Sequence, residues 1–118
     1  MRHDPRAFLW DARESADAIA EFIRERHLDD YLADEMLRSA VERKLEIVGE
    51  ALNRLSREAP ELINGLPELP QAVGLRNILI HGYATIDHDL VWRTAVESLP
   101  PLRDRLNSLL QELDGTEE

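Results

Sequence analysis

Four polar side chains stand close together in an otherwise apolar stretch of this sequence: Arg76, Asn77, His81 and Tyr83. The imidazole of histidine accepts and donates protons near neutral pH, and the guanidinium of arginine binds phosphate through charge-assisted hydrogen bonds. Together these groups suit cleavage of RNA, because the RNA 2′-hydroxyl can attack the neighbouring phosphate without a metal ion. A structural interpretation is equally open: His81, followed by Gly82, could cap carbonyls at a helix end while Arg76 pairs with an acid.

Helical geometry does not aim Arg76 and His81 at one point. Asn77 and His81 are four residues apart and share a helix face. Arg76 and His81 are five residues apart, which separates them by about 140° around an ideal helix. Three arrangements could bring them together: the helix loosens at His81, the long arginine side chain folds around, or two copies of the helix meet across a dimer.

A second set of charged residues lies upstream on a predicted helix: Arg43, Glu50, Arg54 and Arg57. The three arginines could flank a cleft and hold RNA phosphates. The simpler interpretation is a solvated face on which Glu50 and Arg54 form an ordinary i,i+4 ion pair.

Metal and thiol chemistry have little support in this sequence. His3, His27 and His88 have no second ligand at a helical spacing, so we expect no metal site. The chain has no cysteine, which excludes disulfides, zinc–thiolate sites and cysteine nucleophiles. We therefore expect the protein to work without a cofactor.

Overall charge limits the classes of partner. The 118 residues include 14 Lys and Arg against 24 Asp and Glu, a formal net charge of −10. This excludes a protein that coats nucleic acid through its overall field, although a local basic cleft is compatible with it.

Length and a 43% hydrophobic content indicate a single domain over residues 1–118. The N-terminal residues are too charged for a signal peptide, and no apolar run approaches the roughly 20 residues that span a bilayer, so we expect a soluble cytoplasmic protein without membrane contact.

Apolar residues recur at three- and four-residue steps along most of the chain, which predicts an all-α fold. A first helix is expected over residues 5–26 and a second over residues 34–58, with Met36 on its inward stripe. Residues 27–30 are expected to form a short link, and residues 60–70, which are rich in proline, a loop.

Two more helices are expected in the second half of the chain. One covers residues 70–82, and the next begins at a cap formed by Asp87 or Asp89. Pro100 and Pro101 should bend or break this last helix, because proline removes a backbone donor and disfavours helix at the preceding residue. The predicted architecture is an up-and-down bundle of four to five helices, with the last helix kinked at the two prolines.

Two segments of this chain resemble a known family. Arg76, His81 and Tyr83 form the pattern R-x4-H-x-Y with a Gly-Leu lead-in, and residues 43–51 read RKLEIVGEA. The combination is similar to the HEPN superfamily and, within it, to the HepT-like toxins. The resemblance extends over nearly the whole chain.

The resemblance implies specific roles for these residues. Arg76 and His81 match the active-site pair of a metal-independent endoribonuclease, and Asn77 matches the polar residue that supports it. Tyr83 matches the tyrosine that a partner nucleotidyltransferase antitoxin modifies with AMP. The family forms homodimers in which two signatures face each other over a cleft.

Two hypotheses about function follow. The first is an RNase toxin of a type VII-like toxin–antitoxin pair. The alternative is a non-catalytic helical dimer that binds a nucleotidyltransferase, a nucleotide or both, with Arg76 as a phosphate anchor. Growth arrest that disappears in His81→Ala would favour the enzyme, whereas a harmless wild type would favour the binding module.

Overall fold

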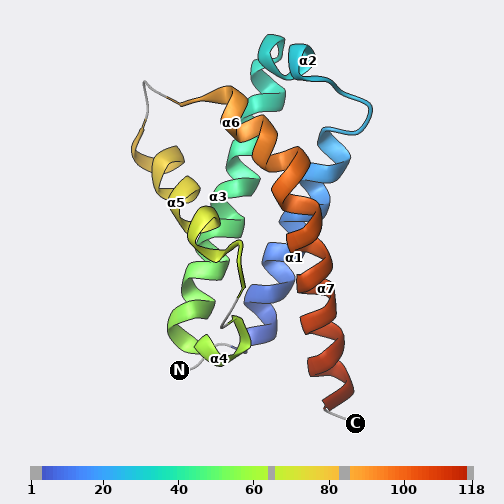
Figure 1. The fold of residues 1–118 in the computed structure, drawn as a ribbon, viewed down its shortest axis with the longest axis vertical. Coiled ribbons are helices and arrows are strands. Elements are labelled where there is room, and N and C mark those ends of the chain that lie inside the picture. Colours follow the sequence, from blue (N-terminus) through green and yellow to red (C-terminus); the bar gives the residue numbers. More distant parts are fainter. Residues whose placement is uncertain (1–3, 64–65, 83–85, 117–118) are drawn as a thin grey trace.

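The computed structural model describes residues 4–63, 66–82 and 86–116, and these form a bundle of helices. Figure 1 shows helical columns that alternate in direction along the longest axis of the molecule, which measures 48 Å. The columns are α1 (Pro5–Phe22), α3 (Glu35–Glu58), α5 (Leu69–His81) and a final column of α6 (His88–Arg93), the π-helix η1 (Thr94–Ser98) and α7 (Leu99–Thr116). The short helices are α2 (Leu28–Ala33) and α4 (Pro60–Ile63). No strand occurs within the described ranges, and the predicted all-α bundle is confirmed.

Aspartate caps begin three of the helices. The side chain of Asp4 accepts a hydrogen bond from the Arg6 N–H, and Pro5 occupies the first turn of α1, where its missing donor has no cost. Asp34 caps α3 and Asp87 caps α6 in the same way. The predicted starts near residues 5 and 34 are therefore correct, and of the two caps considered for the later helix, Asp87 is the one that the structure uses.

Some boundaries differ from the prediction. α1 ends at Phe22, and the expected link at residues 27–30 is partly helical, because α2 begins at Leu28 with Asp30 accepting from the His27 N–H. The expected loop contains the single-turn α4. Met36 is 84% exposed instead of facing inward, since adjacent helical residues point about 100° apart and the neighbouring Leu37 faces the core.

The predicted disturbance in the last helix lies just before its two prolines. Pro100 and Pro101 occupy the first turn of α7, and the preceding residues Thr94–Ser98 form a π-helix in which the Leu99 N–H bonds to the Thr94 carbonyl. Two consecutive residues without an N–H cannot supply the usual α-helical bonds one turn back. The backbone widens there into a π-helix. Of the predicted bend or break, the prolines therefore do not produce a break, and the column remains helical.

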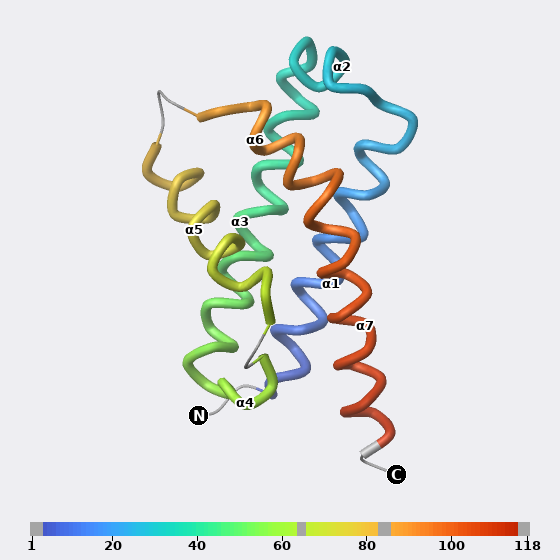
Figure 2. Tube along the Cα trace, in the orientation of Figure 1, coloured from blue at the N-terminus to red at the C-terminus, as the bar shows by residue number. Residues whose placement is uncertain are grey.

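α3 lies at the centre of the bundle. It packs against α1 and α5, and α1 in turn packs against α7. The core between these helices includes the fully buried Leu9, Ile19, Leu52, Leu55 and Leu106. α5 packs mainly on α3 at the edge of the bundle (Figure 2), so its other side faces away from the core.

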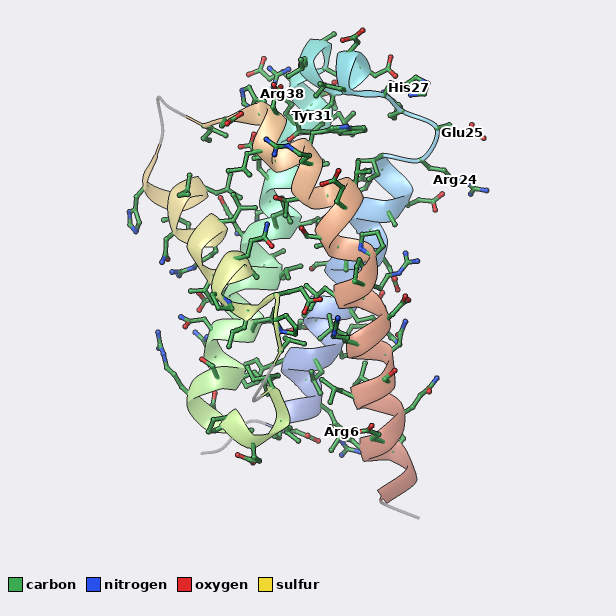
Figure 3. The ribbon with its side chains drawn as sticks, viewed as in Figure 1. Arg6, Arg24, Glu25, His27, Tyr31 and Arg38 are labelled. Atoms are coloured by element: carbon green, nitrogen blue, oxygen red, sulfur yellow. The ribbon has the colours of Figure 1, made fainter. Side chains whose placement is uncertain are left out.

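The α2 end of the bundle is closed by aromatic packing. Tyr31 is fully buried, with its ring centroid 5.3 Å from that of Trp92. Arg24, Glu25 and His27 point outward on the connection from α1 to α2 (Figure 3). In the described part of the chain, no helix combines the length and the apolar character that crossing a membrane requires.

Candidate functional site

Arg76 lies on the side of α5 that faces α3, and its position depends on Gly49. A Cβ atom on residue 49 would collide with the Arg76 Cβ and would stand 2.7 Å from the carbonyl oxygen of Ala72. Glycine therefore lets the two helices approach closely, with the stem of Arg76 crossing α3 at this point. The sequence signal was a glycine inside a helical pattern, which often marks such a contact.

The guanidinium of Arg76 is held from two sides. Its Nη2 lies 2.6 Å from Oε2 of Glu50, and its Nη1 donates a 2.8 Å hydrogen bond to Oδ1 of Asn77. The side chain of Arg76 is 25% exposed. These contacts direct the arginine toward α3 and leave part of it accessible.

Glu50 bridges two arginines. Besides contacting Arg76, it accepts a 3.0 Å hydrogen bond from Nε of Arg54, one turn along α3. The hydrogen bond from Arg54, together with the charge of Arg76, holds the pKa of the Glu50 carboxyl below its usual range. The predicted i,i+4 ion pair of Glu50 and Arg54 thus exists, and the Glu50 carboxylate also contacts Arg76, the arginine of the R-x4-H pattern.

A hollow of about 400 Å³ opens beside this cluster, between α1, α3 and α5. Arg43, Arg54 and Arg76 all line it. Arg43 is paired with Glu46, at 3.2 Å between Nη1 and Oε2. The apolar lining of the hollow comes from Phe8 on α1, Ile47 and Ala51 on α3, and Ile80 on α5. The contribution of α1 was not foreseen from the sequence, because Phe8 and Ile47, which are 39 positions apart, show no local pattern that would connect them.

His81 lies elsewhere on α5. It is the exposed last residue of the helix and does not line the hollow. The Gly82 N–H bonds to the Ile78 carbonyl at 2.7 Å, so the helix is regular to its end. Arg76, directed toward Glu50, does not fold around the helix. Of the three arrangements considered for Arg76 and His81, neither of the two within one chain is adopted.

Of the other residues predicted for the site, one lies beside Arg76 and another lies away from the hollow. Asn77 contacts Arg76, whereas Arg57 is exposed and stands outside the hollow. Tyr83 and His3 lie outside the described residues.

His27 and His88, at which no metal site was expected, lie away from the hollow. His88 places Nδ1 3.8 Å from Oε2 of Glu42, and the His27 side chain is exposed. Among the residues that the structure describes, no three His, Asp or Glu side chains gather as a metal ion would require.

Comparisons with known proteins give consistent matches. The sequence matches the family described as "Ribonuclease HepT-like" over residues 12–109. "Putative RNase MJ1380" of Methanocaldococcus jannaschii is 38% identical over 102 residues, which cover 86% of this chain and 93% of that protein. "Probable ribonuclease HepT" of Thermococcus cleftensis is 33% identical over 111 residues, with 92% and 98% covered. "Putative RNase MJ0127", also of Methanocaldococcus jannaschii, is 30% identical over 119 residues, with 99% and 96% covered. No solved structure matches this chain significantly.

Proposed function

The chain belongs to the HepT-like ribonuclease family, and from this premise we propose that it is a metal-independent endoribonuclease, the toxin of a type VII-like toxin–antitoxin pair. The observation that carries the proposal is the position of Arg76. The arginine of the R-x4-H pattern lies beside a hollow, held by Glu50 and Asn77, with part of its side chain accessible.

In the proposed reaction, the 2′-oxygen of one nucleotide attacks the adjacent phosphorus and the bond from phosphorus to the 5′-oxygen breaks. Two proton transfers accompany this exchange: one proton leaves the 2′-hydroxyl and one is added to the departing 5′-oxygen. His81 carries out one of them, as base or as acid, and the solvent exchanges the other proton. Arg76 stabilises the negative charge that builds on the phosphate in the transition state. The products are a 2′,3′-cyclic phosphate and a 5′-hydroxyl, so the nucleophile is the RNA 2′-oxygen and no water molecule is added in the cleavage step.

We place the working site across a homodimer. Within one chain, Arg76 faces α3 while His81 is exposed at the helix end. Two copies of α5 that meet over a cleft would bring the arginine of one copy near the histidine of the other. Arg43, Arg54 and Arg57 would flank that cleft and contact the phosphates of the RNA.

The proposed regulation involves Tyr83. A nucleotidyltransferase antitoxin would attach one or more AMP groups to its hydroxyl, two residues after His81. The added phosphate would pair with arginine and exclude RNA by charge and volume. After co-expression with a nucleotidyltransferase antitoxin, the intact mass should rise in units of AMP, and Tyr83→Phe should remain unmodified. Equal modification of wild type and Tyr83→Phe would remove Tyr83 from this role.

Cleavage assays on purified protein test the catalytic proposal. His81→Ala should abolish cleavage, and Arg76→Ala should lose roughly 2–4 kcal/mol of transition-state stabilisation. His27→Ala and Arg24→Ala are the matched controls, because both side chains point outward at the connection between α1 and α2 (Figure 3). EDTA should leave cleavage intact. Cleavage that persists in His81→Ala, or that requires added metal, contradicts the mechanism.

The second candidate is the non-catalytic binding module. It is favoured by the same contacts, since an arginine held by Glu50 and Asn77 can anchor a nucleotide phosphate without any catalysis. A wild-type chain that binds a nucleotidyltransferase or a nucleotide but cleaves no RNA would support this candidate.

A further inference from the structure

We propose that the hollow beside Arg76 holds one unpaired nucleotide of the RNA, with its phosphate at Arg54 and Arg76, its base on the apolar lining and Asp11 as the residue that reads the base. The proposal rests on the proposed ribonuclease function and adds the form of substrate: a single strand with a preferred base next to the bound phosphate.

The charges in the hollow are suited to one phosphodiester. Arg54 and Arg76 share the single carboxylate of Glu50, so two positive charges face one negative charge and this group carries a formal charge of +1. A phosphodiester has one negative charge and would complete the neutralisation. Arg43, by contrast, is paired with Glu46. The lining as a whole is formally neutral, with Arg43, Arg54 and Arg76 against Asp11, Glu46 and Glu50. The positive excess is therefore confined to the group of Arg54, Arg76 and Glu50, and it selects where along the hollow the phosphate lies.

The lining of the hollow is suited to a base. Phe8, Ile47 and Ile80 contribute apolar surface next to the arginines. The volume of about 400 Å³ is within the usual size of sites that enclose small ligands. A base can reach such a surface only when it is unpaired and unstacked, because in a duplex its faces are already covered. The hollow therefore indicates a single-stranded substrate.

Asp11 supplies a free acceptor in this hollow. It lies on α1, it is exposed, and none of the described residues forms a hydrogen bond or an ion pair with it. A carboxylate accepts two parallel hydrogen bonds when a partner offers two adjacent N–H donors. Guanine offers this pair through its N1–H and its 2-amino group, whereas uracil offers a single N–H. We therefore expect guanine to be the preferred base.

Binding of mononucleotides tests the proposal without requiring cleavage. By calorimetric titration of the wild type, guanosine 5′-monophosphate should bind at least about tenfold more tightly than ribose 5-phosphate, which lacks the base. Arg54→Ala should weaken binding of all four nucleoside monophosphates alike. Asp11→Asn should remove the preference for guanine, while Glu14→Gln, an exposed acid one turn along α1 that does not line the hollow, should retain it.

Several results would overturn the proposal. Equal affinity for ribose 5-phosphate and for the nucleotides would exclude a base site, and an unchanged guanine preference in Asp11→Asn would exclude Asp11 as its reader. Cleavage of RNA without any nucleotide binding would refute the nucleotide site and leave the ribonuclease function standing. Variant-sensitive nucleotide binding without cleavage of any RNA would refute the ribonuclease function and leave the nucleotide site standing.

Discussion

At the scale of single residues, the function proposed for Arg76 depends on Glu50. An arginine has a long and flexible side chain, so a fixed guanidinium needs partners that limit its rotamers. Glu50 meets the guanidinium at one end, and Asn77 holds another of its nitrogens. Glu50 also lowers the positive charge that a phosphate meets. Its two effects, positioning and neutralisation, act in opposite directions on the reaction, which allows them to be separated by kinetics.

Glu50→Gln should lower kcat at least about tenfold without raising KM. The loss of kcat follows from a guanidinium that is no longer held in place, and KM stays level because removal of a negative charge favours the bound phosphate. Steady-state cleavage of a short RNA measures both constants.

The matched control is Glu46→Gln, one turn earlier on α3, where the carboxylate is paired with Arg43 beside the same hollow. It should change kcat little. An unchanged kcat in Glu50→Gln, or an equal loss in both variants, would show that Glu50 does not position Arg76.

Two carboxylates on α3 should have opposite effects on stability as the pH changes. Burial raises the pKa of the Glu42 carboxyl against the opposing charges of His88 and Arg38, whereas the pKa of Glu50 is lowered. A carboxyl whose pKa is raised on folding stabilises the fold below its unfolded pKa, and this contribution is lost as pH rises through its folded pKa. A lowered pKa gives stability above the unfolded pKa that is lost on acidification.

Urea unfolding between about pH 4 and pH 6, below the ordinary histidine pKa, therefore distinguishes the two sites. As the pH rises, the stability of wild type relative to Glu42→Gln should fall, and its stability relative to Glu50→Gln should rise. Parallel trends in the two variants would contradict the assigned directions.

At the scale of elements, the contact between α3 and α5 sets the site. α5 packs mainly on α3, and Gly49 of α3 leaves room for the Arg76 side chain and the Ala72 carbonyl of α5. Any side chain at residue 49 must separate the helices or move the arginine. The geometry of the site is thus a property of a helix pair, although the chemistry belongs to side chains.

Gly49→Ala should lower the free energy of unfolding by about 1–3 kcal/mol, the usual cost of overpacking. It should also lower cleavage, because it displaces the stem of Arg76. Gly74→Ala is the matched control on α5, since a Cβ there meets no atom within 4 Å. The free energy of unfolding of Gly74→Ala should rise by about 0.5–1 kcal/mol, because alanine has a better helix propensity than glycine. Chemical denaturation measures both, and a Gly49→Ala variant as stable and active as wild type would show that the close approach is unimportant.

At the scale of the whole molecule, the outer side of α5 is the candidate dimer surface. Ile78 is 46% exposed there, one position after Asn77 and three before His81. A net charge of −10 on each chain opposes association, so apolar contact must supply the attraction.

Ile78→Glu should shift the protein toward monomer in sedimentation experiments and lower its specific activity. Dilution of the wild type below the dimer dissociation constant should lower specific activity in the same way. Met36→Glu, at an exposed apolar position on α3, should do neither. A fully active monomer would contradict a site composed of two chains.

Much of the fold follows from the sequence alone, because helices are determined by local pattern. The helix starts near residues 5 and 34, the choice of Asp87 or Asp89 as a cap, and the stop at Gly82 follow from residues within one or two turns of them. The chemistry-bearing residues and their family resemblance were likewise visible in one short stretch. Local pattern was less able to place short helices such as α2, whose ends depend on a few hydrogen bonds.

Tertiary structure alone decided what surrounds those residues. Glu50 and Arg76 are 26 positions apart, and Phe8 and Asp11 reach the same hollow from α1, because three helices converge there. No periodicity within one helix specifies which residue of a second helix its side chain will meet; that depends on how closely the helices pack, and here a glycine permits the close approach. The sequence therefore determined which groups are available for chemistry. The packing of α1, α3 and α5 determined that Arg76 faces a carboxylate and a hollow, while His81 remains on the outside.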